Sequence, residues 1–154
     1  ARSVAAGRPA RRLRRVSRLT DHLAEISLFS GCSAKDLQRL ARAADEISVA
    51  AGTTLTTQGE VGREAFVLLD GTAEVVRDGQ LVATLGPGDH VGELSLLDGG
   101  PRTATVTATT DVELLVLGRP AFNGVLDEIP TLAHKLAVSL ARRLRAAEDL
   151  THVS

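Results

Sequence analysis

The middle of the chain is a series of short apolar segments separated by glycine-containing turns, and this pattern constrains the fold more than any other feature. It extends over residues 47–117. Asp78-Gly79, between two such segments, is a strong signal for a two-residue hairpin. Short strands at this spacing, with few helices among them, predict a small β-roll or sandwich. The predicted strands are Glu46–Val49, Thr53–Thr57, Ala65–Leu69, Thr72–Arg77, Gln80–Leu85, Thr103–Thr109 and Val112–Leu117.

Helices are predicted before this β region. Apolar residues recur three or four positions apart from about Ala10 to Ile26, which is the period of an amphipathic helix. Ser33 followed three residues later by Asp36 is typical of a capping box and predicts the start of a second helix.

Two further helices are predicted after the β region. One spans Arg119–Glu128, with Pro120 suited to its first turn, and the other runs from Pro130 to about Leu150. A broad apolar stripe on the last helix contains Leu132, Leu136, Leu140 and Leu144. Three interpretations of this stripe remain open: packing against the roll, a dimer helix, or a moving lid.

Charge is divided unevenly along the chain. Residues 1–18 contain seven Arg and no acidic residue, whereas the rest holds 11 basic and 19 acidic residues. Only the N-terminal part could therefore attract polyanions. We expect residues 1–18 to be a basic, flexible arm that is solvated or serves as a linker. Contact of this arm with nucleic acid, an acidic partner or a membrane surface is the alternative.

Composition excludes several classes of protein. A single cysteine, Cys32, rules out a disulfide framework and a Cys-x-x-Cys metal or redox site. The longest apolar runs have four or five residues, against about 20 for a membrane span, and the Arg-rich start lacks the apolar stretch of a secretory signal. A cytoplasmic location is therefore expected. With no Tyr or Trp to stack on bases, nucleic acid is not expected as a partner of this chain alone.

Neither catalysis nor a metal site is predicted. The four histidines are scattered, and only His90 lies in the predicted roll, whereas a cupin-type metal site needs two His and a carboxylate that converge. No Ser/His/Asp or Cys/His set is placed to act. We therefore expect a protein that is not an enzyme and that uses no metal or cofactor.

The segment from Val91 to Val106 carries the chemistry. Gly92 permits close backbone approach, and the one-turn helix after it leaves backbone amides unpaired, which is a ready anion site. Arg102 follows a glycine turn, at a position where its guanidinium can bind a phosphate through two N–H groups. Glu93 can accept a hydrogen bond from a ribose hydroxyl. These residues describe a cradle for a nucleotide phosphate. The alternative is a structural salt bridge between Glu93 and Arg102.

This segment resembles the phosphate-binding cassette of cyclic-nucleotide-binding domains, the family that includes the catabolite activator protein and protein kinase A regulatory subunits. The family pattern G-E-[LI]-[AS]-L-L-x-x-x-P-R-x-A-T-V is matched from Gly92 to Val106. Structural glycines of the family are matched at Gly52, Gly59, Gly71 and Gly88. The resemblance covers about residues 28–150. It implies a mainly β fold: an eight-stranded-type, jelly-roll-like β-roll (a double-stranded β-helix) with N-terminal helices and a C-terminal helix pair.

The domain is accordingly expected over residues 19–150, with the roll at about 46–118 and the C-terminal helices at about 119–150. In the cassette, the resemblance implies that Glu93 binds the ribose 2′-hydroxyl and that Arg102 pairs with the cyclic phosphate. The backbone amides of Leu94 and Ser95 would assist Arg102, and Gly92 would lie against the sugar.

The remaining site residues concern the base. By the same resemblance, Val75 and Val91 would line the sugar and base pocket, and Thr103 would lie beside the purine or the phosphate. Because a Thr at this position resembles a guanine-selecting hydroxyl, cGMP stays open beside cAMP. With no Tyr or Trp available, capping of the base would fall to an aliphatic or Arg side chain of the last helix.

The expected function is reversible binding of a cyclic nucleotide, cAMP before cGMP, by a regulatory sensor whose C-terminal helices move with the ligand. One alternative is a transcription regulator of the catabolite-activator type whose DNA-binding part is absent from this chain. Another is a protein-interaction module that docks through the Arg-rich N-terminal helix. Expected partners are the nucleotide and an unidentified effector protein or domain, with a homodimer through the C-terminal helix as a further expectation.

Overall fold

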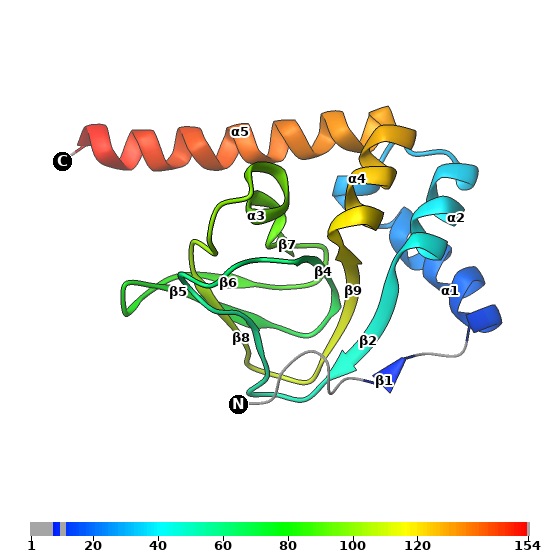
Figure 1. Ribbon diagram of the computed structural model, residues 1–154, viewed down its shortest axis with the longest axis horizontal. Helices are drawn as coiled ribbons and strands as arrows, with labels where there is room; N and C mark the ends of the chain where they lie inside the picture. The colour runs from blue at the N-terminus through cyan, green and yellow to red at the C-terminus, as the bar shows by residue number, and fades with distance from the viewer. Residues whose placement is uncertain (1–7, 10–11, 154) are drawn as a thin grey trace.

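The computed structural model describes residues 8–9 and 12–153. Strands form a roll at the centre of the molecule, helices α1, α2 and α4 lie along one side of it, and α5 runs across one end (Figure 1). The short helix α3 lies between α5 and the roll (Figure 1). This arrangement confirms the predicted order of helices, β-roll and helices.

Two antiparallel sheets make up the roll. One has the strand order β1-β2-β9-β4-β7 and the other the order β3-β8-β5-β6. The eight strands β2 to β9 form the predicted roll, and the two-residue β1 extends one edge. The bounds are β1 Arg8–Pro9, β2 Asp45–Val49, β3 Thr54–Thr56, β4 Glu64–Asp70, β5 Ala73–Arg77, β6 Gln80–Leu85, β7 His90–Val91, β8 Thr105–Ala108 and β9 Val112–Gly118.

Local sequence signals place the turns and caps. Asp78 and Gly79 both have positive φ and join β5 to β6 in the predicted two-residue hairpin. Ser33 and Asp36 form the predicted capping box. The bounds of the helices are α1 Arg12–Ala24, the 3-10 helix η2 Ser27–Phe29, α2 Ala34–Ala43, α3 Glu93–Asp98, α4 Arg119–Glu128 and α5 Pro130–Val153.

Strands β4 and β9 are buried on both faces, and they separate two apolar clusters. Alternate residues of β4 enter different clusters: Ala65 and Val67 face the helices, whereas Phe66 and Leu68 face the inside of the roll. The same alternation holds along β9. Burial on both faces explains why these two segments are the longest apolar runs in the sequence.

The apolar stripe of α5 is only partly covered. Leu132 and Leu136 are buried in the helical cluster and Leu140 is half-buried, but Leu144 is 61% exposed. Packing against the body of the protein therefore accounts for the stripe as far as Leu140 but not for Leu144. None of the described helices is both long and apolar enough to cross a membrane.

The first helix begins inside the segment expected to be a basic arm. α1 starts at Arg12, so that residues 12–18 are helical, and β1 at Arg8–Pro9 pairs with β2. Residues 1–7 and 10–11 lie outside the described part of the chain. The flexibility of residues 1–18 and the limits of 19–150 for the domain remain predictions.

Candidate functional site

The predicted cassette begins at a sharp turn from β7 into α3. Gly92 is the N-cap residue of α3 and has φ of 90°, a left-handed conformation that favours glycine. A Cβ built at Gly92 would lie 2.6 Å from Arg102 Nη1 and 2.9 Å from Glu64 O. A side chain at this position would therefore displace the arginine. The turn also places the amides of Leu94 and Ser95 in the first turn of α3.

Arg102 is buried, and backbone carbonyls hold its side chain. Nη1 donates to Gly92 O at 2.9 Å, and Nη2 donates to Glu64 O at 2.7 Å. The guanidinium carbon lies 5.9 Å from the centre of the Phe66 ring. Burial lowers the pKa of Arg102, and the charges of Glu64 and Glu93 oppose this effect. Because a guanidinium has five N–H donors, three remain for a ligand.

Space for Arg102 comes from a glycine that the sequence reasoning missed. A Cβ built at Gly62 would lie 2.5 Å from Ser95 Cβ and 2.7 Å from Arg102 Cζ. The backbone of Arg102 is fixed by the neighbouring turn, because its N–H donates to Glu60 O and its carbonyl accepts from the N–H of Gly59. The arginine is thus held at both its backbone and its head group.

Glu93 is 2% exposed and ion-paired. Its Oε1 lies 3.0 Å from His90 Nδ1 and 2.7 Å from Arg143 Nη1. Burial raises the pKa of Glu93, but the hydrogen bond and charge of His90, with the charge of Arg143, outweigh burial and hold the pKa below its ordinary value. The carboxylate is therefore charged at neutral pH.

The ion pairs of Glu93 test the alternative that Glu93 and Arg102 form a structural salt bridge with each other. Within the described residues, the recorded ion pairs join Glu93 to His90 and Arg143, and none joins it to Arg102. The two charged groups of the cassette thus have separate partners. This arrangement is unlike a structural salt bridge across a turn.

The three residues predicted to meet the sugar and base lie in two environments. Val75 on β5 and Val91 on β7 are half-buried against the same apolar cluster inside the roll. Thr103 is exposed, and its carbonyl accepts a hydrogen bond from Arg77 Nε at 3.1 Å. The two valines are thus brought together in the roll, whereas Thr103 lies at its surface.

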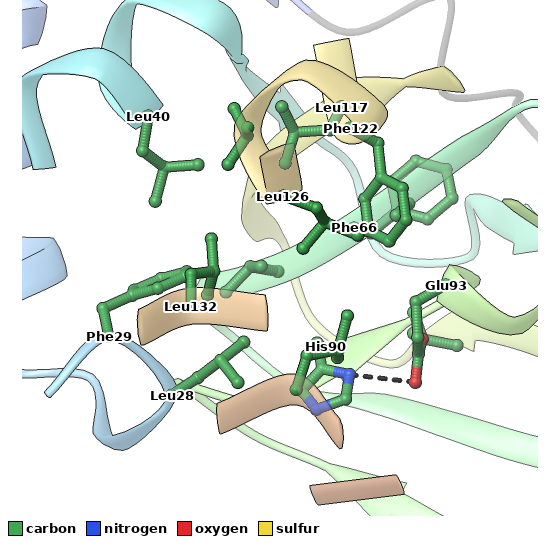
Figure 2. A pocket seen from close by; sticks show the side chains of 15 residues that line it. Leu28, Phe29, Leu40, Phe66, His90, Glu93, Leu117, Phe122, Leu126 and Leu132 are labelled. Carbon is green, nitrogen blue, oxygen red and sulfur yellow. Dashed lines mark ion pairs between the residues drawn. The ribbon is translucent and has the colours of Figure 1, made fainter. Parts of the chain in front are cut away.

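An apolar cavity of about 40 Å³ adjoins the cassette, between the roll and the helices. His90 and Glu93 lie at one end of it, joined by their ion pair, and Phe29, Phe122 and Leu132 line its other parts (Figure 2). The carboxylate of the cassette therefore reaches the boundary between the roll and the helices. Within the described residues, no cluster of His, Cys, Asp and Glu could hold a metal ion.

Two arginines of the C-terminal helices contact α3. From the sequence, Arg119 had no expected role, and an Arg of the last helix, which includes Arg143, was considered only as a cap for the base. Arg143 on α5 bonds Glu93, and its Nη2 donates to His90 O at 2.9 Å. Arg119 at the start of α4 donates to Ser95 O at 3.3 Å. Because these contacts join residues that are 24 to 53 positions apart, no local pattern in the sequence predicts them.

Comparison with known proteins agrees with this geometry. A family model described as "Cyclic nucleotide-binding domain" matches residues 46–128, more than half of the chain. The "Cyclic AMP receptor protein" of Thermus thermophilus is 40% identical over 102 residues, which cover 63% of this chain and 47% of that protein. A "cAMP-dependent protein kinase regulatory subunit" of Yarrowia lipolytica is 38% identical over 114 residues, or 73% of this chain and 30% of that one.

A solved structure shows the same fold. The crystal structure of Thermus thermophilus Catabolite Activator Protein matches with a TM-score of 0.76 and 34% identity, covering 82% of this chain and 62% of that chain. The present chain spans about half or less of the length of the two curated relatives. The matched family, the fold and the charged cassette agree, and the chain belongs to the cyclic nucleotide-binding domain family.

Proposed function

We propose that this chain reversibly binds a cyclic mononucleotide, with cAMP as the ligand, through the cassette at the start of α3. One observation carries the proposal: Arg102 is buried, and no recorded ion pair within the described residues involves it. Its side chain bonds two carbonyl oxygens and retains donors for a phosphate. A buried cation beside the amides of α3 favours a bound anion.

The two charged groups would hold different parts of the ligand. Arg102 and the amides of Leu94 and Ser95 would bind the cyclic phosphate, and Glu93 would accept the ribose 2′-hydroxyl. Both recorded ion pairs of Glu93 are made by Oε1 and leave Oε2 outside them. Val75 and Val91 would line the sugar and base pocket, with Thr103 at its edge.

Ligand binding would be transmitted through α3. This helix is bonded to α4 by Arg119 and to α5 by Arg143, so a displacement of α3 toward a phosphate changes contacts of both C-terminal helices. A ligand shifts such an equilibrium only by its difference in affinity for the two states, and couplings of about 1–3 kcal/mol are typical. We therefore propose a regulatory sensor rather than an enzyme.

A second function is favoured by the exposed end of α5. Because Leu144 continues the apolar stripe but is 61% exposed, the second half of α5 is suited to a contact outside the described chain. We propose that this contact is a homodimer formed through α5. The relatives named as receptors and regulators are longer than this chain, so an effector, such as a DNA-binding part, would lie outside it.

Calorimetric titration of the 154-residue chain with cAMP, cGMP and, as an acyclic control, 5′-AMP tests the proposal. We expect micromolar or tighter binding of cAMP, weaker binding of cGMP and little binding of 5′-AMP. A preference for cGMP would assign base selection to Thr103. Absence of heat with both cyclic nucleotides, repeated by an equilibrium dialysis assay, would contradict the proposed function.

A further inference from the structure

His90 joins the cassette to the last helix through its two ring nitrogens. It lies on β7, where it pairs with Val67 of β4, and its side chain is buried. Nδ1 is 3.0 Å from Glu93 Oε1, and Nε2 is 2.9 Å from Ser139 Oγ on α5. Figure 2 shows the imidazole aimed at the carboxylate from the edge of the apolar cavity.

The rules for hydrogen-bond donors and acceptors determine which group donates between His90 and Glu93. An ionised carboxylate only accepts, so Nδ1 must carry the proton that faces Glu93. Nε2 meets the Ser139 hydroxyl, which can accept from a ring nitrogen that carries a proton or donate to one that does not. Glu93 is the charged end of this series of contacts, because its pKa lies below the ordinary value despite burial. The Nδ1 proton thus faces Glu93, and Ser139 is the partner on the other side of the ring.

Of the two groups on Glu93 Oε1, His90 is the more rigid. The side chain of Arg143 is 47% exposed, and a long exposed side chain loses considerable conformational entropy when it is held in one position. The His90 side chain is 9% exposed, is anchored on a strand and has a second bond to Ser139. The orientation of the carboxylate is therefore set mainly by the imidazole.

We propose that His90 is a positioning residue of the ribose site: Nδ1 orients the Glu93 carboxylate for the 2′-hydroxyl, and Nε2 ties that orientation to α5 through Ser139. This inference rests on the proposed function. It adds a specificity role for a residue outside the cassette pattern, and it makes ribose recognition depend on where α5 lies.

The test compares two substitutions that preserve different halves of the imidazole. In His90→Asn the amide nitrogen can occupy the place of Nδ1 and keep the bond to Glu93, whereas in His90→Gln the longer amide reaches the place of Nε2 and the bond to Glu93 is lost. Affinities for cAMP and 2′-deoxy-cAMP are measured by calorimetry for the parent and both variants. The ratio of the two affinities reports recognition of the 2′-hydroxyl alone.

We expect the parent and His90→Asn to prefer cAMP over 2′-deoxy-cAMP by about tenfold or more, the usual effect of a hydrogen bond to a charged group. His90→Gln should reduce the preference to about threefold or less, with affinity for 2′-deoxy-cAMP nearly unchanged. Ser139→Ala leaves the imidazole in place and should reduce the preference by a smaller factor. This variant provides the test of the inference if His90→Gln does not fold.

Four results would overturn the inference. If His90→Gln weakens both nucleotides equally, His90 has only a structural role. If neither His90→Gln nor Ser139→Ala changes the ratio, Glu93 is oriented without them. A parent that binds cAMP but does not distinguish it from 2′-deoxy-cAMP would remove the ribose role of Glu93 while leaving the proposed function intact, whereas a parent that binds neither nucleotide would overturn both.

Discussion

Glu93 at the start of α3 and Arg143 on α5 are 50 positions apart in the sequence, and their side chains meet, with Arg143 Nη1 2.7 Å from Glu93 Oε1. The carboxylate that we assign to the ribose is thus already in contact with the last helix. A ligand that reorients Glu93 must change this contact. The coupling that we propose between ligand and helix would therefore pass through this one side chain.

Gly62 is expected to be essential for the position of Arg102. In Gly62→Ala the new Cβ would lie within 2.8 Å of atoms of Arg102 and Ser95. We expect a loss of about 1–3 kcal/mol of stability, the usual cost of overpacking, and a loss of about tenfold or more in cAMP affinity. Urea unfolding and calorimetry would measure the two effects.

Gly86→Ala is the matched control, since nothing lies within 4 Å of a Cβ built at Gly86. Its stability and cAMP affinity should stay close to those of the parent. Equal behaviour of the two alanine variants would mean that the space at Gly62 does not matter for the site.

Glu93 should make the stability of the protein depend on acid pH. Its pKa in the folded protein lies below the ordinary value of 4.5, because its ion pairs outweigh its burial. Its contribution is therefore fully present above about pH 5 and is lost as the pH falls through the folded pKa. The free energy of unfolding, measured in urea from pH 7 to pH 3, should fall more steeply for the parent than for Glu93→Gln.

The exposed carboxylate of Glu148 provides the control for this series. Glu148→Gln should follow the pH profile of the parent. If Glu93→Gln also follows it, the ion pairs of Glu93 do not stabilise the folded protein.

Two leucines of the same stripe on α5 should differ in their effect on stability. Leu136 is 6% exposed and Leu144 is 61% exposed. Truncation of a buried leucine leaves a cavity, so Leu136→Ala should lower the free energy of unfolding by about 2–5 kcal/mol. Leu144→Ala should change it by less than about 0.5 kcal/mol when unfolding is measured at a concentration at which the chain is monomeric.

The same pair tests the proposed dimer. Sedimentation of the parent over a range of concentrations should show self-association that Leu144→Ala weakens. A parent that stays monomeric at the highest concentration would contradict a dimer through α5. Similar destabilisation by both substitutions would show that Leu144 is packed within one chain.

Local patterns in the sequence predicted the α-helices and most strands because each is determined by neighbouring residues. The hairpin at Asp78-Gly79 and the capping box at Ser33 depend on conformations or contacts within four residues. Strand β7 was missed, because its two residues, His90 and Val91, are held only by pairing with β4. The ends of some strands were predicted slightly wrongly: the strand predicted to begin at Thr103 begins at Thr105.

The site was predicted in part for the same reason. The cassette residues from Gly92 to Arg102 are close in sequence, so their pattern could be read directly. The partners of Glu93 could not be predicted, since Arg143 comes from another helix and approaches only when α5 packs across the roll. Gly62 gave no signal either, because its role depends on the side chain of Arg102 lying against it.

The most direct test of the account is the affinity of Arg102→Ala for cAMP beside that of the parent. Loss of the charged partner of a desolvated phosphate should cost about 2–4 kcal/mol, or about 30- to 1,000-fold in affinity. Arg39→Ala, at an exposed position on α2, is the control and should bind like the parent. Circular dichroism would establish that each variant is folded. A folded Arg102→Ala that binds cAMP as tightly as the parent would contradict the assignment of the phosphate site.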